Sequence, residues 1–208
     1  MQVLVVYCHP RPDSFTAAVK NTVLEKLHAA DAAVTVLDLY AEGFDPVMGG
    51  PENAAYLDCT LGRSHVAAHV VAIEACDTLI FVYPTWWYGL PAMLKGWLDR
   101  VLLPGSAFLM PDETHSDIRP GLTHIKRLAV FTTCGASWWL TRIIGAPGKR
   151  TILRGLRILC APRCRTAFAA HYLMDASSPT SRAKHLKRVA RKMDRFLGGP
   201  GEPQKVPA

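Results

Sequence analysis

Residues 78–102, TLIFVYPTWWYGLPAMLKGWLDRVL, place a strand, a turn and a helix in immediate succession and decide the fold. The run Thr78–Val82 is short, continuous and apolar, which is typical of a strand covered on both faces. After the turn, apolar residues recur at the helical period of about 3.6 residues. A strand that leads directly into an amphipathic helix predicts one βα unit of an α/β domain. The apolar stripe of this helix consists of Leu90, Met93, Leu94, Trp97, Leu98, Val101 and Leu102.

The same alternation continues on both sides of this unit. Strand alternates with helix five times, which predicts a doubly wound parallel sheet of five strands with helices on both faces. In such folds a ligand binds at the carboxyl ends of the strands, where the strand order reverses. The other predicted strands are 3–7, 34–37, 128–132 and the less regular 166–174; the other helices are 15–27, 66–75, 186–197 and 138–159, the last interrupted around 145–148.

Length and composition indicate one soluble domain. The chain has 208 residues, of which 50% are hydrophobic and 20% charged, enough for one core but few for two. We expect a domain over residues 1–197 and a flexible C-terminal tail over 198–208. No apolar run reaches the roughly 20 residues of a membrane helix, and residues 1–10 lack the features of a signal peptide. Six cysteines without such a leader favour reduced thiols and a cytoplasmic location.

Charge is distributed unevenly along the chain. Residues 1–141 hold 9 Lys/Arg and 14 Asp/Glu, a net charge of −5, whereas residues 142–195 hold 14 and 2, a net charge of +12. A basic C-terminal third suits nucleic acid, anionic lipid, a dinucleotide phosphate or an acidic partner protein. Charge alone does not choose among these partners.

Three loops should meet at the ligand edge of the sheet. The loop after the first strand, His9–Thr16, ends at a helix start that Ser14 or Asp13 would cap, and free amide groups there favour an anion such as phosphate. The aromatic loop 83–91 and the small-residue segment 132–137 follow two other strands and suit a flat ligand. Read singly, each loop also fits an ordinary turn, and the indoles also fit a core or a subunit interface.

These motifs together resemble a known family. His9-Pro10 with Ser14-Phe15-Thr16, the long stretch Pro84–Val101, and Thr132-Thr133-x-Gly135 look like the flavodoxin-like NAD(P)H quinone reductases, the DT-diaphorase group with its bacterial relatives. Asp38-Leu39-Tyr40 with Phe44-Asp45-Pro46 fits the same family, so the resemblance covers about residues 3–135.

The resemblance implies a flavodoxin-like fold and a noncovalent flavin, FMN or FAD, reduced by NAD(P)H and reoxidised by a quinone or a similar electrophile. Chemistry would reside mainly on the flavin. The implied phosphate contacts are His9, Ser14, Phe15 and Thr16, and the implied ring contacts are Pro84, Thr85, Trp86, Trp87, Thr132, Thr133 and Gly135. We expect Tyr88, Trp138 and Trp139 to bound the slot where nicotinamide and acceptor alternate. We also expect a homodimer with the active site near its interface.

The family resemblance and the basic C-terminal third each leave an alternative function open. One is a regulatory flavoprotein subunit of a membrane transport system. Another is a nucleic-acid or membrane-surface binder that uses the basic C-terminal third, although that region has no nucleic-acid-binding motif and we expect no nucleic acid. Membrane association would arise only through this basic third or through a partner. His65 and His69 have the spacing of metal ligands but lack a third ligand, so no metal is expected.

Overall fold

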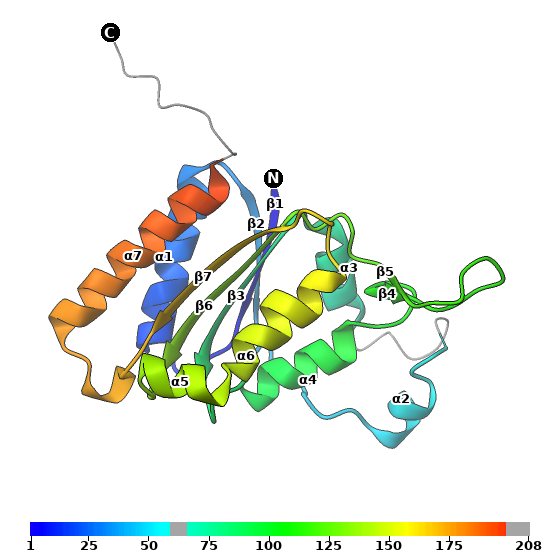
Figure 1. The fold of residues 1–208 in the computed structure, drawn as a ribbon, viewed down its shortest axis with the longest axis horizontal. Helices are drawn as coiled ribbons and strands as arrows, with labels where there is room; N and C mark the ends of the chain where they lie inside the picture. The colour runs from blue at the N-terminus through cyan, green and yellow to red at the C-terminus, as the bar shows by residue number, and fades with distance from the viewer. Residues whose placement is uncertain (59–65, 199–208) are drawn as a thin grey trace, which may run out of the picture.

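The sheet has five parallel strands in the order β2–β1–β3–β6–β7 (Figure 1), in a computed structural model that describes residues 1–58 and 66–198. From β1 the chain continues to β2 on one side and later to β3 on the other, so the strand order reverses between β1 and β3. The predicted doubly wound, flavodoxin-like sheet with helices on both faces is confirmed. The strands are β1 (Gln2–Tyr7), β2 (Ala33–Asp38), β3 (Thr78–Thr85), β6 (Arg127–Cys134) and β7 (Arg165–His171).

Helices cover the two faces of the sheet as separate layers. Figure 1 shows α1 (Phe15–Ala29) and α7 (Pro179–Leu197) on one face. The other face carries α3 (Ala67–Ala75), α4 (Ala92–Val101), and the consecutive segments α5 (Trp138–Ile144), α6 (Pro147–Arg150) and the π-helical η1 (Thr151–Leu156). Because right-handed crossovers connect the parallel strands, successive helices settle on opposite faces on either side of β1.

Alternate strand residues supply two cores, one under each helix layer. In β3, Ile80 packs beneath α1 and α7, whereas Phe81 packs beneath α4. Trp97 of α4 has no exposed surface and meets Phe81 edge to face, with ring centroids 6.0 Å apart. This explains why the central strands β1 and β3 are apolar at nearly every position: both of their faces are buried.

The helix predicted over 138–159 is divided, as its Gly-Ala-Pro-Gly interruption indicated. α5 ends where Gly145 takes a left-handed φ of 94°, and Pro147 starts α6 two residues later. Residues 151–156 then continue as a wider π-helix. The break turns the chain at the carboxyl edge of the sheet, beside the predicted ligand loops.

Three short elements were not predicted from the sequence. They are α2 (Gly50–Ala54), the one-turn η2 (Met174–Ala176) and a hairpin of two-residue strands, β4 (Phe108–Leu109) and β5 (Arg119–Pro120). Elements this short have no measurable hydrophobic period, so pattern reading misses them.

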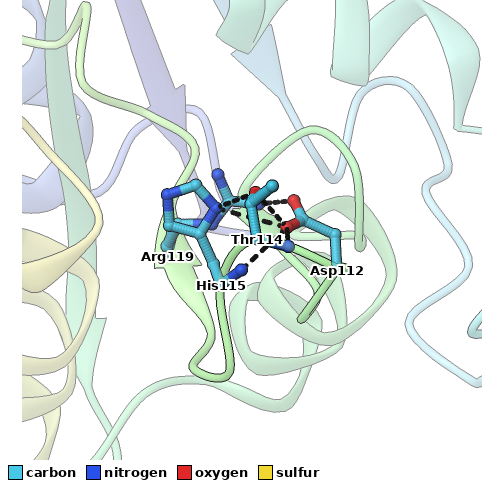
Figure 2. Close-up of polar contacts among 4 residues, drawn as sticks. All are labelled: Asp112, Thr114, His115 and Arg119. Carbon is cyan, nitrogen blue, oxygen red and sulfur yellow. Dashed lines mark hydrogen bonds and ion pairs between the residues drawn. The ribbon is translucent and has the colours of Figure 1, made fainter.

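Polar contacts order the loop of this hairpin. Figure 2 shows the Asp112 carboxylate accepting from Thr114 and His115 and pairing with Arg119. Hydrogen bonds from Thr114 hold the pKa of the Asp112 carboxyl well below its usual range. Asp112 therefore ties Thr114, His115 and Arg119 together within the loop.

The predicted flexible tail lies almost entirely outside the described residues. Within residues 1–58 and 66–198, no helix combines the length and the hydropathy that a bilayer crossing requires.

Candidate functional site

The three predicted loops meet in one open cleft of about 850 Å³ at the carboxyl edge of the sheet. Walls come from the loop after β1, the end of β3 with its aromatic turn, and the segment after β6. Of the predicted cofactor and slot residues, the cleft is lined by His9, Ser14, Phe15, Thr16, Pro84, Thr85, Trp86, Trp87, Tyr88, Thr133 and Gly135. Predicted residues as far apart in the sequence as His9 and Gly135 thus share one site.

The loop after β1 forms the start of α1. Ser14 is the N-cap, and its hydroxyl accepts from the Ala17 amide at 3.1 Å; Asp13, the other candidate cap, pairs instead with Arg11 at the surface. The amide groups of Phe15 and Thr16 have no acceptor among the described residues. Two free N–H groups at the positive end of a 15-residue helix favour an anion.

His9 is arranged to donate a hydrogen bond into the same place. Its Nδ1 lies 3.0 Å from the Arg11 amide nitrogen and 3.2 Å from the Arg11 carbonyl oxygen; in the tautomer in which Nδ1 accepts from the amide, the proton is on Nε2. Burial lowers the pKa of His9 below its ordinary value, so the ring is neutral near pH 7. A neutral Nε2–H donor beside free helix amides suits a phosphate group.

Buried hydroxyl pairs join the walls of the cleft. Thr16 and Thr133 lie 3.1 Å apart between their Oγ1 atoms, and Thr85 and Thr132 lie 2.8 Å apart. Thr132 does not line the cleft itself; it is buried and lines a small neighbouring cavity. The pairs link the start of α1 and the end of β3 to the end of β6, which preorganises the site.

The aromatic loop after β3 is a tight turn with two left-handed residues. The Gly89 amide donates to the Trp86 carbonyl at 2.9 Å, while Trp87 and Tyr88 have φ values of 47° and 61°. These values match a type I′ turn, which non-glycine residues adopt only at a cost in strain. The turn leaves the Trp87 side chain 94% exposed.

A glycine that sequence reasoning missed fixes the position of this turn. Gly148 of α6 lies against Gly89, so an added Cβ would sit 3.0 Å from the Gly89 carbonyl carbon. Gly89 itself has no such neighbour and no left-handed φ. The close approach of α6 to the aromatic turn therefore depends on Gly148 and not on Gly89.

The segment after β6 meets a carboxylate from η2. The Asp175 Oδ2 atom occupies the space beside Gly135, 2.7 Å from where a Cβ would be. Cys134 turns its thiol inward, 3.7 Å from the Thr141 hydroxyl, and only 4% of the residue is exposed. Asp175 and Met174 close the side of the cleft next to Gly135. Both residues follow the last strand, and this position was the one sequence signal that could have placed them at the ligand edge. A single turn of helix has no hydrophobic periodicity by which it could be predicted.

The two tryptophans of α5 lie apart from the described lining of the cleft. Trp138 and Trp139 are 58% and 59% exposed; Trp138 lies under the Arg142 guanidinium, 5.7 Å from the ring centroid. Trp138 lines a neighbouring groove, and Leu140 is the α5 residue in the cleft. The slot role of both tryptophans remains a prediction.

The histidines with metal-like spacing have other surroundings. His69 accepts the Trp97 indole hydrogen bond at 3.1 Å and lies 3.6 Å from Glu42, whereas His65 lies outside the described residues. Across the described part of the chain, no group of three or more candidate side chains is placed to hold a metal ion.

A doubly wound sheet whose switch-point cleft combines a phosphate-type helix start with flat apolar walls defines the class of flavodoxin-like α/β proteins. Consistent with this class, the family model described as having a flavodoxin-like fold matches residues 1–196. The chain belongs to that family.

Known relatives agree with the assignment. Ribosyldihydronicotinamide dehydrogenase (quinone) of Pongo abelii is 34% identical over 137 residues, which cover 58% of this chain and 59% of that protein. The chain matches a little over half the length of the first such relatives. The structure of Smu.1420 from Streptococcus mutans has a TM-score of 0.80 at 26% identity, over 94% of this chain and 100% of that one. An NAD(P)H:quinone oxidoreductase of Methanothermobacter marburgensis shares the fold, with a TM-score of 0.78 at 24% identity over 93% of this chain and 97% of that one.

Proposed function

We propose that the protein is a flavin-dependent NAD(P)H oxidoreductase that transfers hydride from NAD(P)H, through bound FMN or FAD, to quinones or similar electrophilic acceptors. The observation that carries the proposal is the convergence of a phosphate-type helix start and an aromatic turn in one cleft. Relatives that bear quinone dehydrogenase names support the acceptor class.

The residues present fit a flavin. A cleft of about 850 Å³ is within the usual size of cofactor sites. The free amides of Phe15 and Thr16 and the neutral His9 provide donors for a phosphate, as required at one end of a flavin mononucleotide. Pro84 and Trp86 supply flat apolar surface at the other end.

The chain's own groups bind and orient rather than react. His9 and the N-terminus of α1 hold the phosphate, and Thr16 and Thr133 keep the loops in register. The backbone of the β3 end and of Gly135 faces the ring edge, and Tyr88 borders the place of the acceptor. A flavin bound there would supply the hydride-transfer chemistry between donor and acceptor.

The proposal includes a homodimer whose interface lies near the active site. Large apolar side chains are exposed beside the cleft and on the segment that follows it, among them Trp139, Ile143 and Ile158. A largely apolar groove of about 620 Å³ also runs between α2, α4 and η1. Exposed apolar surface of this extent favours association.

The cellular setting is part of the same proposal. We place residues 1–197 in one domain, because the family model spans nearly that range. An NAD(P)H donor and five buried, unpaired cysteines among the described residues suit a reducing cytoplasm.

The first test is the absorbance spectrum of the purified protein, followed by mass analysis of any extracted cofactor. We expect a yellow protein that oxidises NAD(P)H rapidly when menadione is supplied. A colourless protein that neither flavin reconstitutes would refute the proposal. Bound flavin with negligible turnover would keep the binding assignment and refute the enzymatic one.

A further inference from the structure

A second concave site, which the proposed function does not use, lies along the outer edge of β7. It is a groove of about 670 Å³ between α7 on one side and the α5–α6–η1 segments on the other; Figure 1 shows β7 between these two helix layers. One wall carries Arg142, Lys149, Arg150 and Arg154, and the opposite wall carries Lys192 and Arg195. No carboxylate is among the described residues that line it.

The positive charge of this groove is not neutralised from within the protein. In the described part of the chain, none of these six side chains forms an ion pair with a carboxylate. Lys149 lies over the Phe168 ring, 4.5 Å from its centroid, and Arg165 on the floor donates to the carbonyls of Arg195 and Gly198. Like charges that converge from several elements into a concavity raise the local positive potential and attract polyanions.

Charged side chains also protect exposed sheet edges from pairing with other chains, which is the simplest reason for cations beside β7. Protection of a sheet edge requires neither a concave surface nor aromatic side chains. Here the groove also has the half-exposed Trp138 indole at its α5 end and the Tyr172 ring beside it. Arginine forks and a partly exposed indole together suit a phosphorylated nucleotide.

The groove adjoins the cleft. A small cavity of about 20 Å³ beneath α5 shares Thr85, Tyr88 and Cys134 with the cleft, and it shares Lys149, Phe168 and Tyr172 with the groove. Trp138 and Leu140, two residues apart on α5, face the groove and the cleft respectively. A ligand that extends around the first turn of α5 therefore reaches both.

We propose that the groove binds the adenosine end of NADPH, with the 2′-phosphate and the pyrophosphate on the arginine and lysine walls and adenine against Trp138. The proposal rests on the proposed function and deepens it, because it names NADPH as the preferred donor. NADH lacks the 2′-phosphate and so forfeits the charge-assisted hydrogen bonds that distinguish the two donors. Nicotinamide would then lie in the cleft.

The test is calorimetric titration of the flavin-loaded protein with 2′,5′-ADP and, separately, with 5′-AMP. We expect 2′,5′-ADP to bind at least about tenfold more tightly, because a lost contact to a charged group reduces affinity by roughly that factor. The double substitution Arg154→Gln with Lys192→Gln should weaken 2′,5′-ADP binding and lower the NADPH-to-NADH ratio of kcat/KM, each by about tenfold or more. Lys187→Gln with Arg191→Gln, an equal loss of charge at exposed positions outside the groove, should change neither quantity.

Three results would overturn the groove assignment alone: no saturable binding of 2′,5′-ADP, equal effects of the two double substitutions, or binding that does not compete with NADPH. Preference for a short DNA duplex over 2′,5′-ADP would also overturn it, in favour of a nucleic-acid surface. Equal turnover with both donors by an active, flavin-loaded enzyme contradicts the inference and leaves the proposed function intact. Absence of flavin, or of turnover with either donor, refutes the proposed function itself, whereas 2′,5′-ADP titration still reports on the groove.

Discussion

The proposed phosphate site at the start of α1 depends on individual side chains. The substitutions His9→Ala and Ser14→Ala together should weaken flavin affinity by about tenfold or more, because a charge-assisted donor and the organisation of the loop are lost. The free energy of unfolding should fall by only about 1 kcal/mol, the usual cost of a lost cap. Flavin titration of the apoprotein and denaturant unfolding measure the two effects.

A matched substitution separates cap loss from ligand loss. Ser178 caps α7 in the same way, accepting from the Ser181 amide at 3.1 Å, far along the chain from the helix start at Ser14. Ser178→Ala should reduce stability by a similar amount and leave flavin affinity unchanged. If the folded double variant binds flavin as tightly as the wild type, the phosphate assignment is wrong.

Residue-level prediction succeeded where a residue type has a local reason to be at its position. The cap at Ser14 and the turn at Trp86–Gly89 follow from short-range chemistry, and the structure places both at the cleft. The Thr16–Thr133 pair and the approach of Asp175 to Gly135 involve residues far apart in the sequence. Such contacts depend on which strands become neighbours, and a single sequence does not specify side-chain partners at that range.

At the scale of elements, α6 holds the aromatic turn in place. Gly148→Ala should push the turn away, because the new methyl group would lie 3.0 Å from Gly89. We expect a loss of about 1–3 kcal/mol in stability, as for other overpacked sites, together with weaker flavin binding. Gly155→Ala is the matched control, since a Cβ there meets nothing within 4 Å. If Gly148→Ala behaves like the control, α6 does not position the turn.

The contact between α7 and the start of α1 should be sensitive to acid. Buried His185 of α7 faces Phe15 and His171, with ring centroids 5.9 and 5.0 Å away, and Arg188 lies beside it. Burial, then Arg188, lowers the pKa of His185 to about 3. The unfolded chain binds a proton near pH 6.5 that the folded protein resists, so stability is retained above pH 6.5 and falls as the pH decreases toward 3.

Thermal unfolding measured between pH 7 and 4 tests this dependence. His185→Leu stays neutral and removes a buried Nε2 atom that has no partner, so its stability should depend less steeply on pH, by up to about 1.4 kcal/mol per pH unit. His28→Leu, at an exposed position of α1, is the control and should retain the wild-type slope. Parallel curves for wild type and His185→Leu would contradict the prediction.

Elements were predictable in proportion to their length. The central strands and the long helices bury continuous apolar faces, so their periodicity is visible in the sequence. The break after α5 was also visible, because glycine and proline act through the local backbone. In contrast, η2 and the β4–β5 hairpin owe their form to hydrogen bonds of single residues, such as Asp112 with Thr114.

At the scale of the whole molecule, we expect sedimentation velocity to show a dimer at micromolar concentration. The apolar groove between α2, α4 and η1 and the exposed apolar residues near α5 would be covered by a second copy. A monomer with full activity at that concentration would exclude the dimer from the mechanism. Concentration-dependent activity that follows the dimer fraction would place the second copy at the active site.

The cleft takes its walls from almost the whole length of the chain, from His9 to Asp175. During synthesis, therefore, no binding site exists until the last strand and η2 have left the ribosome. At roughly 5–20 residues per second, the phosphate loop waits for seconds before its partners emerge. The cofactor can therefore bind only after nearly the whole chain has been synthesised. A chain that ends before residue 174 would lack part of the cleft wall.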